Sequence, residues 1–357
     1  MLLYQVHSIS VVVISYNLEN FILEALSSVY AQTHSCSEVI LADDNSTDST
    51  IALVKKYFPS VVISKSCNRQ SPLLNAFQGF SRSKGDLIFF LDGDDVWMPD
   101  KLERCVSEFD ANPTHFLVSH AHMRVDESLS PLLCSDATSR NIDRIFKGPK
   151  SLIQPRLRAS VMFRKGFWLG SAYGFRRQCF DEKFFRDIVL NSPLSSCSYL
   201  DLVLGPYLAF TNPAGSIGYI HDHHFFYRIH QSNSAASDSV FSQMSALRRM
   251  KATTVLTAKV LKAAGANPTE IYNTYLPILF YLKYIGFLLV RAPAMTAKYF
   301  ILSRSFILAS PFSLLREILR LLAFVFPFGP RIFFYCKKKM TLFYALSHRF
   351  VARFRGL

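Results

Sequence analysis

Three aspartates stand within four residues, directly after an apolar run. The run Leu87–Leu91 (LIFFL) is typical of a buried strand, and Asp92-Gly93-Asp94-Asp95 follows it. Gly93 permits a tight backbone turn. Carboxylates this close repel one another unless a cation binds them. Hard divalent ions such as Mg²⁺ or Mn²⁺ prefer oxygen ligands and bridge carboxylates to a diphosphate. The spacing therefore predicts a divalent-metal and diphosphate site, with a solvated acidic turn as the simpler interpretation.

A second acidic cluster follows another apolar run. The segment Asp43-Asp44-Asn45-Ser46-Thr47-Asp48 comes after Val39–Ala42. Its carboxylates can accept hydrogen bonds from a pyrimidine N3–H and from ribose hydroxyls, and acids at a helix start are also favourable in themselves. Tyr16 follows the strand-like run Ile9–Ser15 and suits stacking on a base, or else a buried or capping role. These residues predict a nucleoside site.

The elements that must position both clusters alternate between strand and helix over the first 125 residues. Alternation at this spacing predicts an α/β sheet with right-handed crossovers, in which ligands bind beyond the carboxyl ends of the strands. Both acidic clusters fall at those ends. The predicted strands are Ile9–Ser15, Val39–Ala42, Val61–Ser64, Leu87–Leu91, Phe116–Ser119 and Ser216–Ile220, and the predicted helices are Phe21–Ala31, Thr47–Phe58, Leu73–Ser83, Lys101–Ala111 and the region near Tyr199–Phe210.

Three ordered motifs carry a resemblance to a known family. Ser15-Tyr16-Asn17, Ala42–Asp48 and Leu91–Asp95 resemble the inverting family 2 glycosyltransferases of the GT-A fold. A weaker match continues through Gly170–Arg177 to Tyr227-Arg228-Ile229-His230, so the resemblance covers about two-thirds of the chain. Gln70 and Leu74 stand where that family often has Gly and Arg. The resemblance implies a nucleoside diphosphate sugar as donor, with Asp44 at the base, Tyr16 near it, and Asp92 and Asp94 holding donor and metal.

The resemblance also implies a catalytic base. Inverting displacement needs a carboxylate that takes the proton of the acceptor hydroxyl, and the family presents it at a helix start. Ser198 and Tyr199 occupy the corresponding Glu-Asp positions, so Asp201 is the first candidate for the base and Asp187 the second. In the Tyr-Arg-x-His motif, we expect Arg228 to bind the diphosphate and His230 to bind the metal.

Charge is distributed unevenly along the 357 residues. The chain has a net charge of +14, but residues 245–357 hold 18 Lys and Arg against two acids, a net of +16. The first 244 residues therefore have a net charge of −2. The seven cysteines lie far apart without a CxxC pair, which indicates a reducing compartment. No signal peptide is apparent at the start of the sequence.

The basic C-terminal third predicts membrane association without a span. Its longest apolar stretches, Tyr275–Leu282, Ile285–Val290 and Leu321–Phe328, are shorter than the roughly 20 residues that cross a bilayer. Interleaved Lys, Arg and aromatic residues suit helices lying in the interface of an anionic membrane, and a re-entrant hairpin at Leu314–Tyr335 is an alternative. A helical appendage and a nucleic-acid-binding tail are the other interpretations, the latter less favoured.

These observations combine into one expectation. Residues 1–235 form a GT-A type nucleotide-sugar-binding domain with a mostly parallel central sheet, divided into a nucleotide-binding half (1–125) and an acceptor half (126–235). Residues 236–357 form a helical, basic, membrane-associating region on the cytoplasmic face of the cell inner membrane. With Mn²⁺ or Mg²⁺, the domain moves a sugar, preferably from a UDP-sugar, to a glycan or lipid-linked acceptor in surface polysaccharide or glycolipid synthesis. A catalytically inactive membrane scaffold is the alternative.

Overall fold

The computed structural model describes residues 7–67, 71–132, 142, 145–162, 170–230, 240–289 and 293–302. Within these residues, eight strands form one sheet in the order β3-β2-β1-β4-β7-β6-β8-β5. The strands are β1 (Ile9–Ser15), β2 (Glu38–Asp43), β3 (Val62–Lys65), β4 (Leu87–Asp92), β5 (Val96–Trp97), β6 (His115–Val125), β7 (Gly174–Arg176) and β8 (Ser216–Arg228).

One half of the sheet is parallel, as the alternating pattern predicts. Strand β1 pairs in parallel with β2 on one side and β4 on the other, and β3 pairs in parallel with β2. The register sets Ser15 beside Asp43 and Ile14 beside Asp92. The carboxyl ends of β1, β2 and β4 are therefore level, and both acidic clusters start from the same edge.

The other half of the sheet is mixed, which corrects the expectation of a mostly parallel sheet. Strand β7 is antiparallel to both β4 and β6, and β5 is antiparallel to β8, while β6 and β8 run parallel. Strands β6 and β8 also extend well beyond the predicted Phe116–Ser119 and Ser216–Ile220. Their histidine-rich second halves pair with each other through register shifts between His120 and Met123, and such bulges disrupt the alternation by which a strand is recognised.

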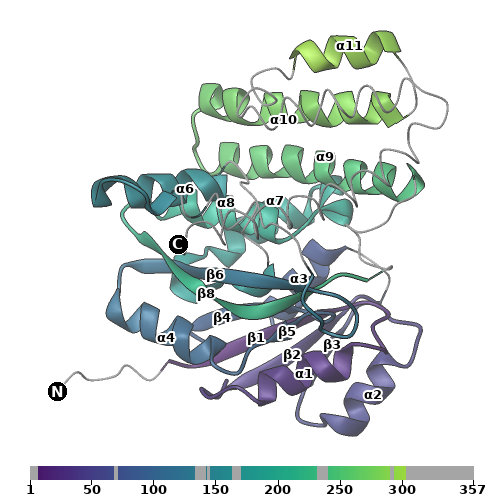
Figure 1. Cartoon of the computed structure of the whole chain (residues 1–357), viewed down its shortest axis with the longest axis vertical. Helices are drawn as coiled ribbons and strands as arrows, with labels where there is room; N and C mark the ends of the chain where they lie inside the picture. Colours follow the sequence, from purple (N-terminus) through teal and green to yellow (C-terminus); the bar gives the residue numbers. More distant parts are fainter. Residues whose placement is uncertain are drawn as a thin grey trace, which may run out of the picture.

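Helices cover both faces of the sheet (Figure 1). Val11 and Val13 of β1 pack in one hydrophobic cluster with side chains from α1, α2 and α4, and Val12 packs in the other with α3, α6, α7 and α8. The α-helices are α1 (Ile22–Tyr30), α2 (Thr50–Tyr57), α3 (Pro72–Phe80), α4 (Lys101–Ala111), α6 (Ile153–Met162), α7 (Glu182–Leu190), α8 (Asp201–Thr211), α9 (Val240–Ala263), α10 (Pro268–Leu289) and α11 (Pro293–Leu302), and the short 3₁₀ turns are η1 (Lys150–Leu152), η2 (Gly170–Ala172), η3 (Arg177–Cys179) and η4 (Pro193–Cys197).

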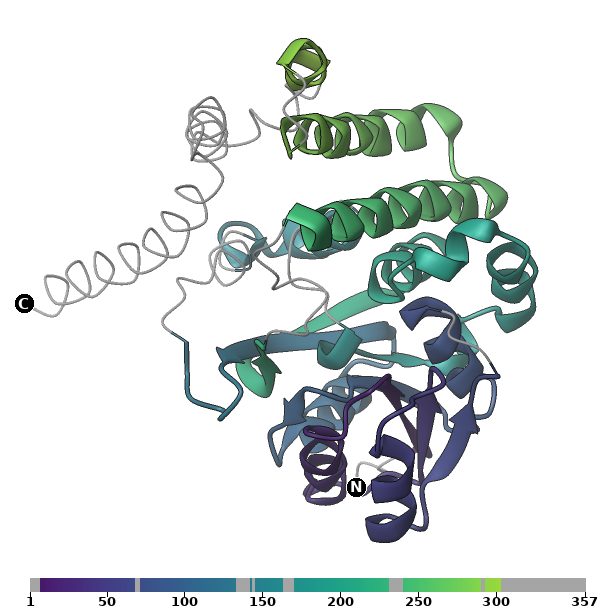
Figure 2. The ribbon, with the colours of Figure 1, turned by 90° about the vertical axis from the view of Figure 1, so that its right-hand side faces the viewer.

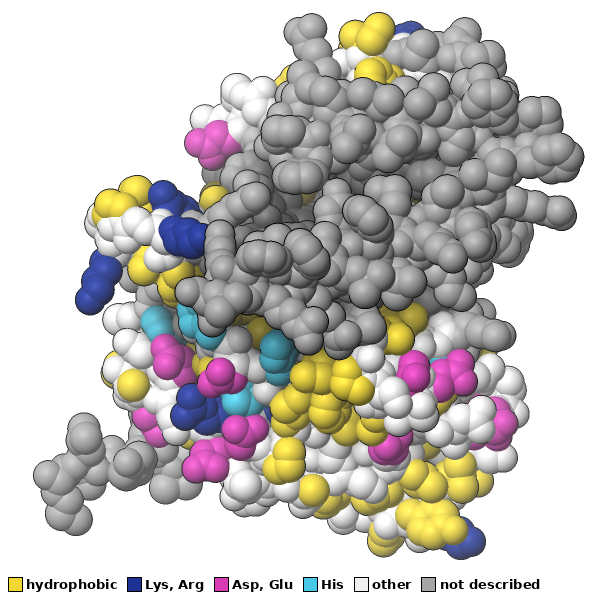
Figure 3. Space-filling view, in the orientation of Figure 1, with side chains coloured by type: hydrophobic (Ala, Val, Ile, Leu, Met, Phe, Trp, Pro, Cys, Tyr) yellow, Lys and Arg dark blue, Asp and Glu magenta, His cyan; other side chains and the backbone are white. Residues whose placement is uncertain are grey.

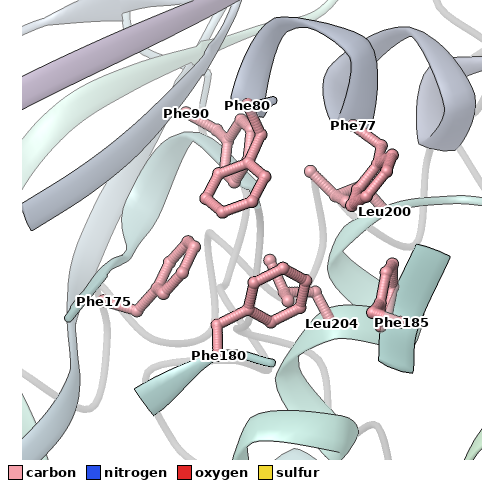
Figure 4. A pocket seen from close by; sticks show the side chains of 8 residues that line it. All are labelled: Phe77, Phe80, Phe90, Phe175, Phe180, Phe185, Leu200 and Leu204. Carbon is pink, nitrogen blue, oxygen red and sulfur yellow. The ribbon is translucent and has the colours of Figure 1, made fainter. Parts of the chain in front are cut away.

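Aromatic rings dominate the core between the sheet and helices α3, α7 and α8. The rings of Phe80 and Phe180 meet edge to face with centroids 5.0 Å apart, a favourable geometry for two aromatic side chains. Tyr207 of α8 meets Phe180 edge to face with centroids 5.7 Å apart, so this packing holds α8, the helix that starts at Asp201, against the sheet. A small apolar cavity remains among the rings (Figure 4), lined by Phe77, Phe80, Phe90, Phe175, Phe180, Phe185, Leu200 and Leu204.

The C-terminal helices stack outward from this core (Figures 1 and 2). Helix α9 packs on α7, α8 and η4, and its Leu256 and Val260 belong to the same hydrophobic cluster as the sheet. Thr257 of α9 donates a hydrogen bond to the Leu202 carbonyl oxygen at 2.9 Å. Helix α10 packs on α9, and α11 on α10. None of the helices in the described ranges is both long enough and apolar enough to cross a membrane.

Several sequence predictions concern residues outside these ranges. Gln70, the re-entrant stretch Leu314–Tyr335 and the basic residues at 337–339, 349, 353 and 355 lie there. Residues 231–239, which include the predicted domain boundary at residues 235 and 236, lie there as well, and α9 starts at Val240.

Candidate active site

The turn after β4 presents two of the three predicted acids at the edge of the sheet. The Gly93 amide donates to the Ile14 carbonyl at 2.8 Å, and the Asp95 amide donates to the Asp92 carbonyl at 2.9 Å. A Cβ atom on Gly93 would lie 2.9 Å from the Ile14 oxygen, so a side chain does not fit there without a shift. The turn therefore needs glycine at this position, with Asp92 and Asp94 on either side.

Asp95 is the internal support of this turn. Its side chain is buried, and its carboxylate accepts hydrogen bonds from the Ser171 hydroxyl at 2.7 Å and the Arg228 amide at 3.0 Å. Ser171 in turn accepts from the Asp92 amide at 3.0 Å. Burial, followed by the charges of Asp94 and Asp92, raises the pKa of Asp95 well above its ordinary value. Asp95 thus joins β4, η2 and β8 and is not presented to solvent.

Asp94 and His230 lie together, as the predicted metal set requires. The Nε2 atom of His230 is 2.9 Å from Oδ2 of Asp94, and the imidazole lies against the Phe21 ring with centroids 4.6 Å apart. His230 is buried, whereas the Asp94 side chain retains 19% of its exposure. The structure therefore brings a partly exposed carboxylate and an imidazole to one point.

Asp92 lies within electrostatic range of Asp201, the first candidate for the base. Burial, then the charges of Asp94 and Asp201, raises the pKa of Asp92 to about 8. Asp201 is the first residue of α8, and its Oδ1 accepts from the Leu202 amide at 2.9 Å. Asp187, the second candidate, is exposed on α7. Asp201 is therefore the candidate base whose charge reaches the acidic turn, whereas Asp187 lies on an exposed helix surface.

Arg228 lies beneath the acidic turn. Its side chain is 2% exposed, its Nε donates to the Asp94 carbonyl at 2.8 Å, and its Nη1 donates to the Glu127 carbonyl at 2.6 Å. Its Nη2 pairs with Glu24 of α1 at 2.5 Å, and the guanidinium lies 4.9 Å from the centroid of the Phe21 ring. These contacts hold the turn in place. The predicted contact of Arg228 with a diphosphate stays a prediction.

The nucleoside side of the site is built from the ends of β1 and β2. Asn17 has φ 53°, its amide donates to the Ser46 hydroxyl at 2.9 Å, and its side-chain oxygen accepts from the Thr47 amide at 2.8 Å. Asp43 is buried and accepts from the Ser46 amide at 2.8 Å. The two loops are thus tied together.

The predicted base-contacting residues lie in these tied loops. Tyr16 is half-buried and Asp44 is 5% exposed, with its amide donating to the Ser15 carbonyl at 2.9 Å. Asn75 of α3 donates to the Ala42 carbonyl at 2.7 Å and so joins the strand ends from below. Tyr16 and Asp44 therefore share the edge that carries Asp92, because the register levels their strands.

Sequence reasoning missed a buried lysine under the acidic turn. Lys101 is fully buried, its Nζ donates to the Ser171 carbonyl at 2.5 Å, and it lies 3.7 Å from the centroid of the Trp97 ring. Burial lowers its pKa to about 7. Its position at the start of a helix resembles that of any surface lysine, so no pattern in the sequence marks this side chain as buried. Ser171 lies within the weaker Gly170–Arg177 match, which was the one available sign of its role.

Comparison with known proteins decides the family. Residues 10–177 match the family model of glycosyl transferase family 2. An uncharacterized glycosyltransferase of Nostoc sp. is 29% identical over 239 residues, which make up 64% of this chain and 67% of that protein. Residues 10–177 are a glycosyltransferase family 2 domain. The acidic turn, the base-side loops and most of the sheet of this glycosyltransferase lie within those residues.

Two further comparisons concern the fold and the named activities of relatives. The glycosyltransferase is 27% identical over 121 residues to an Escherichia coli protein named UDP-Glc:alpha-D-GlcNAc-diphosphoundecaprenol beta-1,3-glucosyltransferase WfaP, covering 33% of this chain and 47% of that protein. The solved mannosyltransferase PcManGT from Pyrobaculum calidifontis, in complex with GDP-Man and Mn²⁺, aligns with a TM-score of 0.51 and 14% identity over 96% of this chain and 86% of that one. This likeness shows a GT-A-like α/β fold.

The donor set of the glycosyltransferase fits a cation that a substrate helps to hold. In the described part of the chain, no three His, Cys, Asp or Glu side chains form a complete cage for a metal ion. Mg²⁺ is typically held by one or two carboxylates while substrate phosphates supply further oxygens. In a site of that kind, Asp94, which lies 2.9 Å from His230, and Asp92, which the like charge of Asp94 acts on, would supply the protein's oxygen ligands.

Proposed function

We propose that the glycosyltransferase moves a sugar from a nucleoside diphosphate sugar to a hydroxyl of a glycan or lipid-linked acceptor, with inversion. The observation that carries this proposal is that Asp92 and Asp94 stand at the end of β4, on the strand edge where Tyr16 and Asp44 also lie, with the charge of Asp201 acting on Asp92. A nucleoside diphosphate needs a base and ribose pocket at one end and countercharge at the other. The two groups of residues supply these at adjacent strand ends.

Each side chain has a part in this reaction. Asp44 accepts hydrogen bonds from the nucleoside, and Tyr16 lies against the base. Asp201 takes the proton from the acceptor hydroxyl as that oxygen attacks the anomeric carbon, on the face opposite the departing diphosphate. Asp92, Asp94 and His230 would hold Mn²⁺ or Mg²⁺, and a bound ion would supply the positive charge that balances the leaving diphosphate. Arg228 and Asp95 hold the turn that carries these ligands.

A UDP-sugar is the donor we favour. A carboxylate such as Asp44 is suited to the N3–H of a uracil ring, and the E. coli relative is named for UDP-Glc and a diphosphoundecaprenol acceptor. The same name supports a lipid-linked acceptor and a place in surface polysaccharide or glycolipid synthesis.

A donor screen tests the proposal. Calorimetry of the full-length chain against UDP-glucose, UDP-N-acetylglucosamine, dTDP-glucose and GDP-mannose, with Mn²⁺ or Mg²⁺, should show tightest binding for a UDP-sugar. Asp94→Ala should abolish transfer, because the diphosphate loses its countercharge, and leave the circular dichroism spectrum intact. Asp222→Ala is the matched control, since Asp222 is an exposed carboxylate of β8 that lies 3.8 Å from Arg104 of α4. Absence of binding to every nucleotide sugar would refute the proposal.

We further propose that the C-terminal end rests on the cytoplasmic face of an anionic membrane. Helices α10 and α11 lie farthest from the sheet (Figures 1 and 2). They expose Tyr272 of α10 by 63% and Ile301 of α11 by 61%, and Ile301 follows the exposed Lys298 by three residues. Around α4 and β8, by contrast, acidic and histidine side chains gather (Figure 3). Anionic lipids attract basic segments, and exposed apolar side chains add an insertion that salt does not remove.

Vesicle flotation tests this orientation. The full-length chain should float with phosphatidylcholine vesicles that contain phosphatidylglycerol, and Ile301→Asp should reduce the floated fraction. Tyr57→Asp is the matched control, because Tyr57 is an apolar side chain 53% exposed on α2, at the other end of the molecule. If wild-type protein stayed with the supernatant, or if both variants behaved alike, the assignment of this surface would be wrong.

A further inference from the structure

Tyr173 occupies the junction between the acidic turn and the aromatic core. It follows η2, which holds the turn through Ser171, and it precedes β7, the antiparallel neighbour of β4. Its ring is fully buried in the hydrophobic cluster that contains Phe90 and Leu200. One end of this side chain is therefore fixed by core packing, and the other end carries a hydroxyl.

The hydroxyl of Tyr173 has no hydrogen-bond partner within the described residues. Buried tyrosine hydroxyls normally find a partner, because an unbonded polar group away from water is unfavourable. The neighbouring positions of the same cluster, including Phe90, Phe175 and Phe180, are filled by phenylalanine. A phenylalanine at 173 would fill the same space without that penalty, so packing alone does not account for the hydroxyl.

The groups around the phenol indicate what it binds. Its pKa is raised well above the ordinary value by burial first, and then by the charges of Asp201 and Asp92. The phenol therefore remains a neutral hydrogen-bond donor close to two carboxylates. Ile88, Phe90 and Asp92 are alternate residues of β4 and lie on one face of it, and Ile88 and Phe90 pack in the same cluster as Tyr173 and Leu204 of α8. The hydroxyl that follows η2, the carboxylate at the end of β4 and the carboxylate at the start of α8 are thus close enough for the two charges to act on the phenol.

We propose that Tyr173 is a substrate-binding residue whose hydroxyl donates a hydrogen bond to a sugar hydroxyl held between Asp92 and Asp201. A sugar hydroxyl accepts through its oxygen and donates through its proton, so one such group satisfies the phenol and a carboxylate together. The sugar belongs either to the nucleotide donor or to the acceptor. This inference rests on the proposed function, because it needs a sugar in the site.

The test compares Tyr173→Phe with Tyr207→Phe in the full-length chain. Tyr207 is a matched control because it is a buried tyrosine of α8 in the same aromatic cluster, stacked on Phe184 with centroids 5.6 Å apart. Each variant is measured for thermal unfolding, for binding of UDP and of the nucleotide sugar that wild type binds most tightly, and for transfer kinetics. Removing the hydroxyl leaves the ring in place, so the fold is preserved.

We expect Tyr173→Phe to lower kcat/KM by about ten- to a hundredfold with an unchanged or raised Tm and unchanged affinity for UDP. Tyr207→Phe should keep wild-type kcat/KM. If affinity for the nucleotide sugar falls while UDP binding is unchanged, the partner is the donor sugar. If only the KM for acceptor rises, the partner is the acceptor. A fall in Tm that accompanies the loss of activity would overturn the inference, since it indicates a structural hydroxyl.

The wild-type measurements separate the role of Tyr173 from the proposed function. If wild type binds and transfers a nucleotide sugar and Tyr173→Phe matches it in every measurement, the role of Tyr173 is refuted and the function stands. If wild type binds no nucleotide sugar from the panel, both are refuted.

Discussion

Replacing Arg228 by methionine separates two roles for that residue. The sequence motif assigns it to the diphosphate, whereas the structure shows a side chain 2% exposed that donates to the carbonyl oxygens of Asp94 and Glu127 at 2.8 and 2.6 Å. Hydrogen bonds from a charged donor contribute about 1.5–3 kcal/mol each. The pair with Glu24 adds about 0–1 kcal/mol, because that carboxylate is 47% exposed and solvent screens it. We expect Arg228→Met to lose about 3–5 kcal/mol of unfolding free energy.

Urea unfolding followed by circular dichroism measures this loss. Arg104→Met is the control, because Arg104 is 52% exposed and its pair with Asp222 spans 3.8 Å. Its unfolding free energy should change by less than about 0.5 kcal/mol. If Arg228→Met unfolded within about 1 kcal/mol of wild type and lost affinity for UDP instead, the buried supporting role would be wrong. The diphosphate contact predicted from the motif would then be right.

Three other perturbations test the site and its support. Asp201→Asn should lower kcat by about 10²–10⁴-fold without changing UDP affinity, while Asp187→Asn, on the exposed surface of α7, should match wild type in the same transfer assay. Because folding raises the pKa of Asp92 from 3.8 to about 8, the native state binds its proton more tightly than the unfolded state. In the absence of divalent cations, the unfolding free energy of wild type should therefore decrease between about pH 4 and pH 8, relative to that of Asp92→Asn. Urea titrations that showed the same pH dependence of the unfolding free energy for both proteins would contradict the raised pKa. Leu256→Ala should cost about 2–4 kcal/mol in urea unfolding, since its side chain is fully buried, and a loss below about 1 kcal/mol would show that α9 contributes little to the core.

The parallel half of the sheet was predictable because its strands are buried on both faces. The run Ile9–Ser15 is apolar and β-branched apart from Ser10 and Ser15, and β1 has the predicted bounds. The mixed half was not predictable in the same way. Strand β7 is three residues long, too short for a periodicity, and it is a strand because β4 and β6 bond to it from both sides.

Some residues of the candidate site could likewise be found from the sequence, and others could not. Acids that follow a strand can be found from sequence because the sheet itself sets their place, as Asp44, Asp92 and Asp94 show. Residues that support or complete the site are set by packing between distant segments. Lys101 and Ser171 meet across 70 positions of the chain, and Arg228 reaches Glu24 across 204. Spacing in a sequence carries no signal for such pairs.

The chain becomes strongly basic after about residue 240, but the hydrophobic core does not end there. The predicted boundary at residues 235 and 236 stays a prediction, but α9 lies C-terminal to it and buries Leu256 and Val260 among side chains of the sheet and α8. Thr257 also bonds to the Leu202 carbonyl, one residue after Asp201. The net charge of a helix reflects mainly the side chains that face outward, whereas its packing depends on the few side chains that face inward. For α9 these two measures disagree, so this helix is basic by composition and yet supports the helix that carries the candidate base. A membrane that bound α10 and α11 would therefore be connected to Asp201 through a single packed helix.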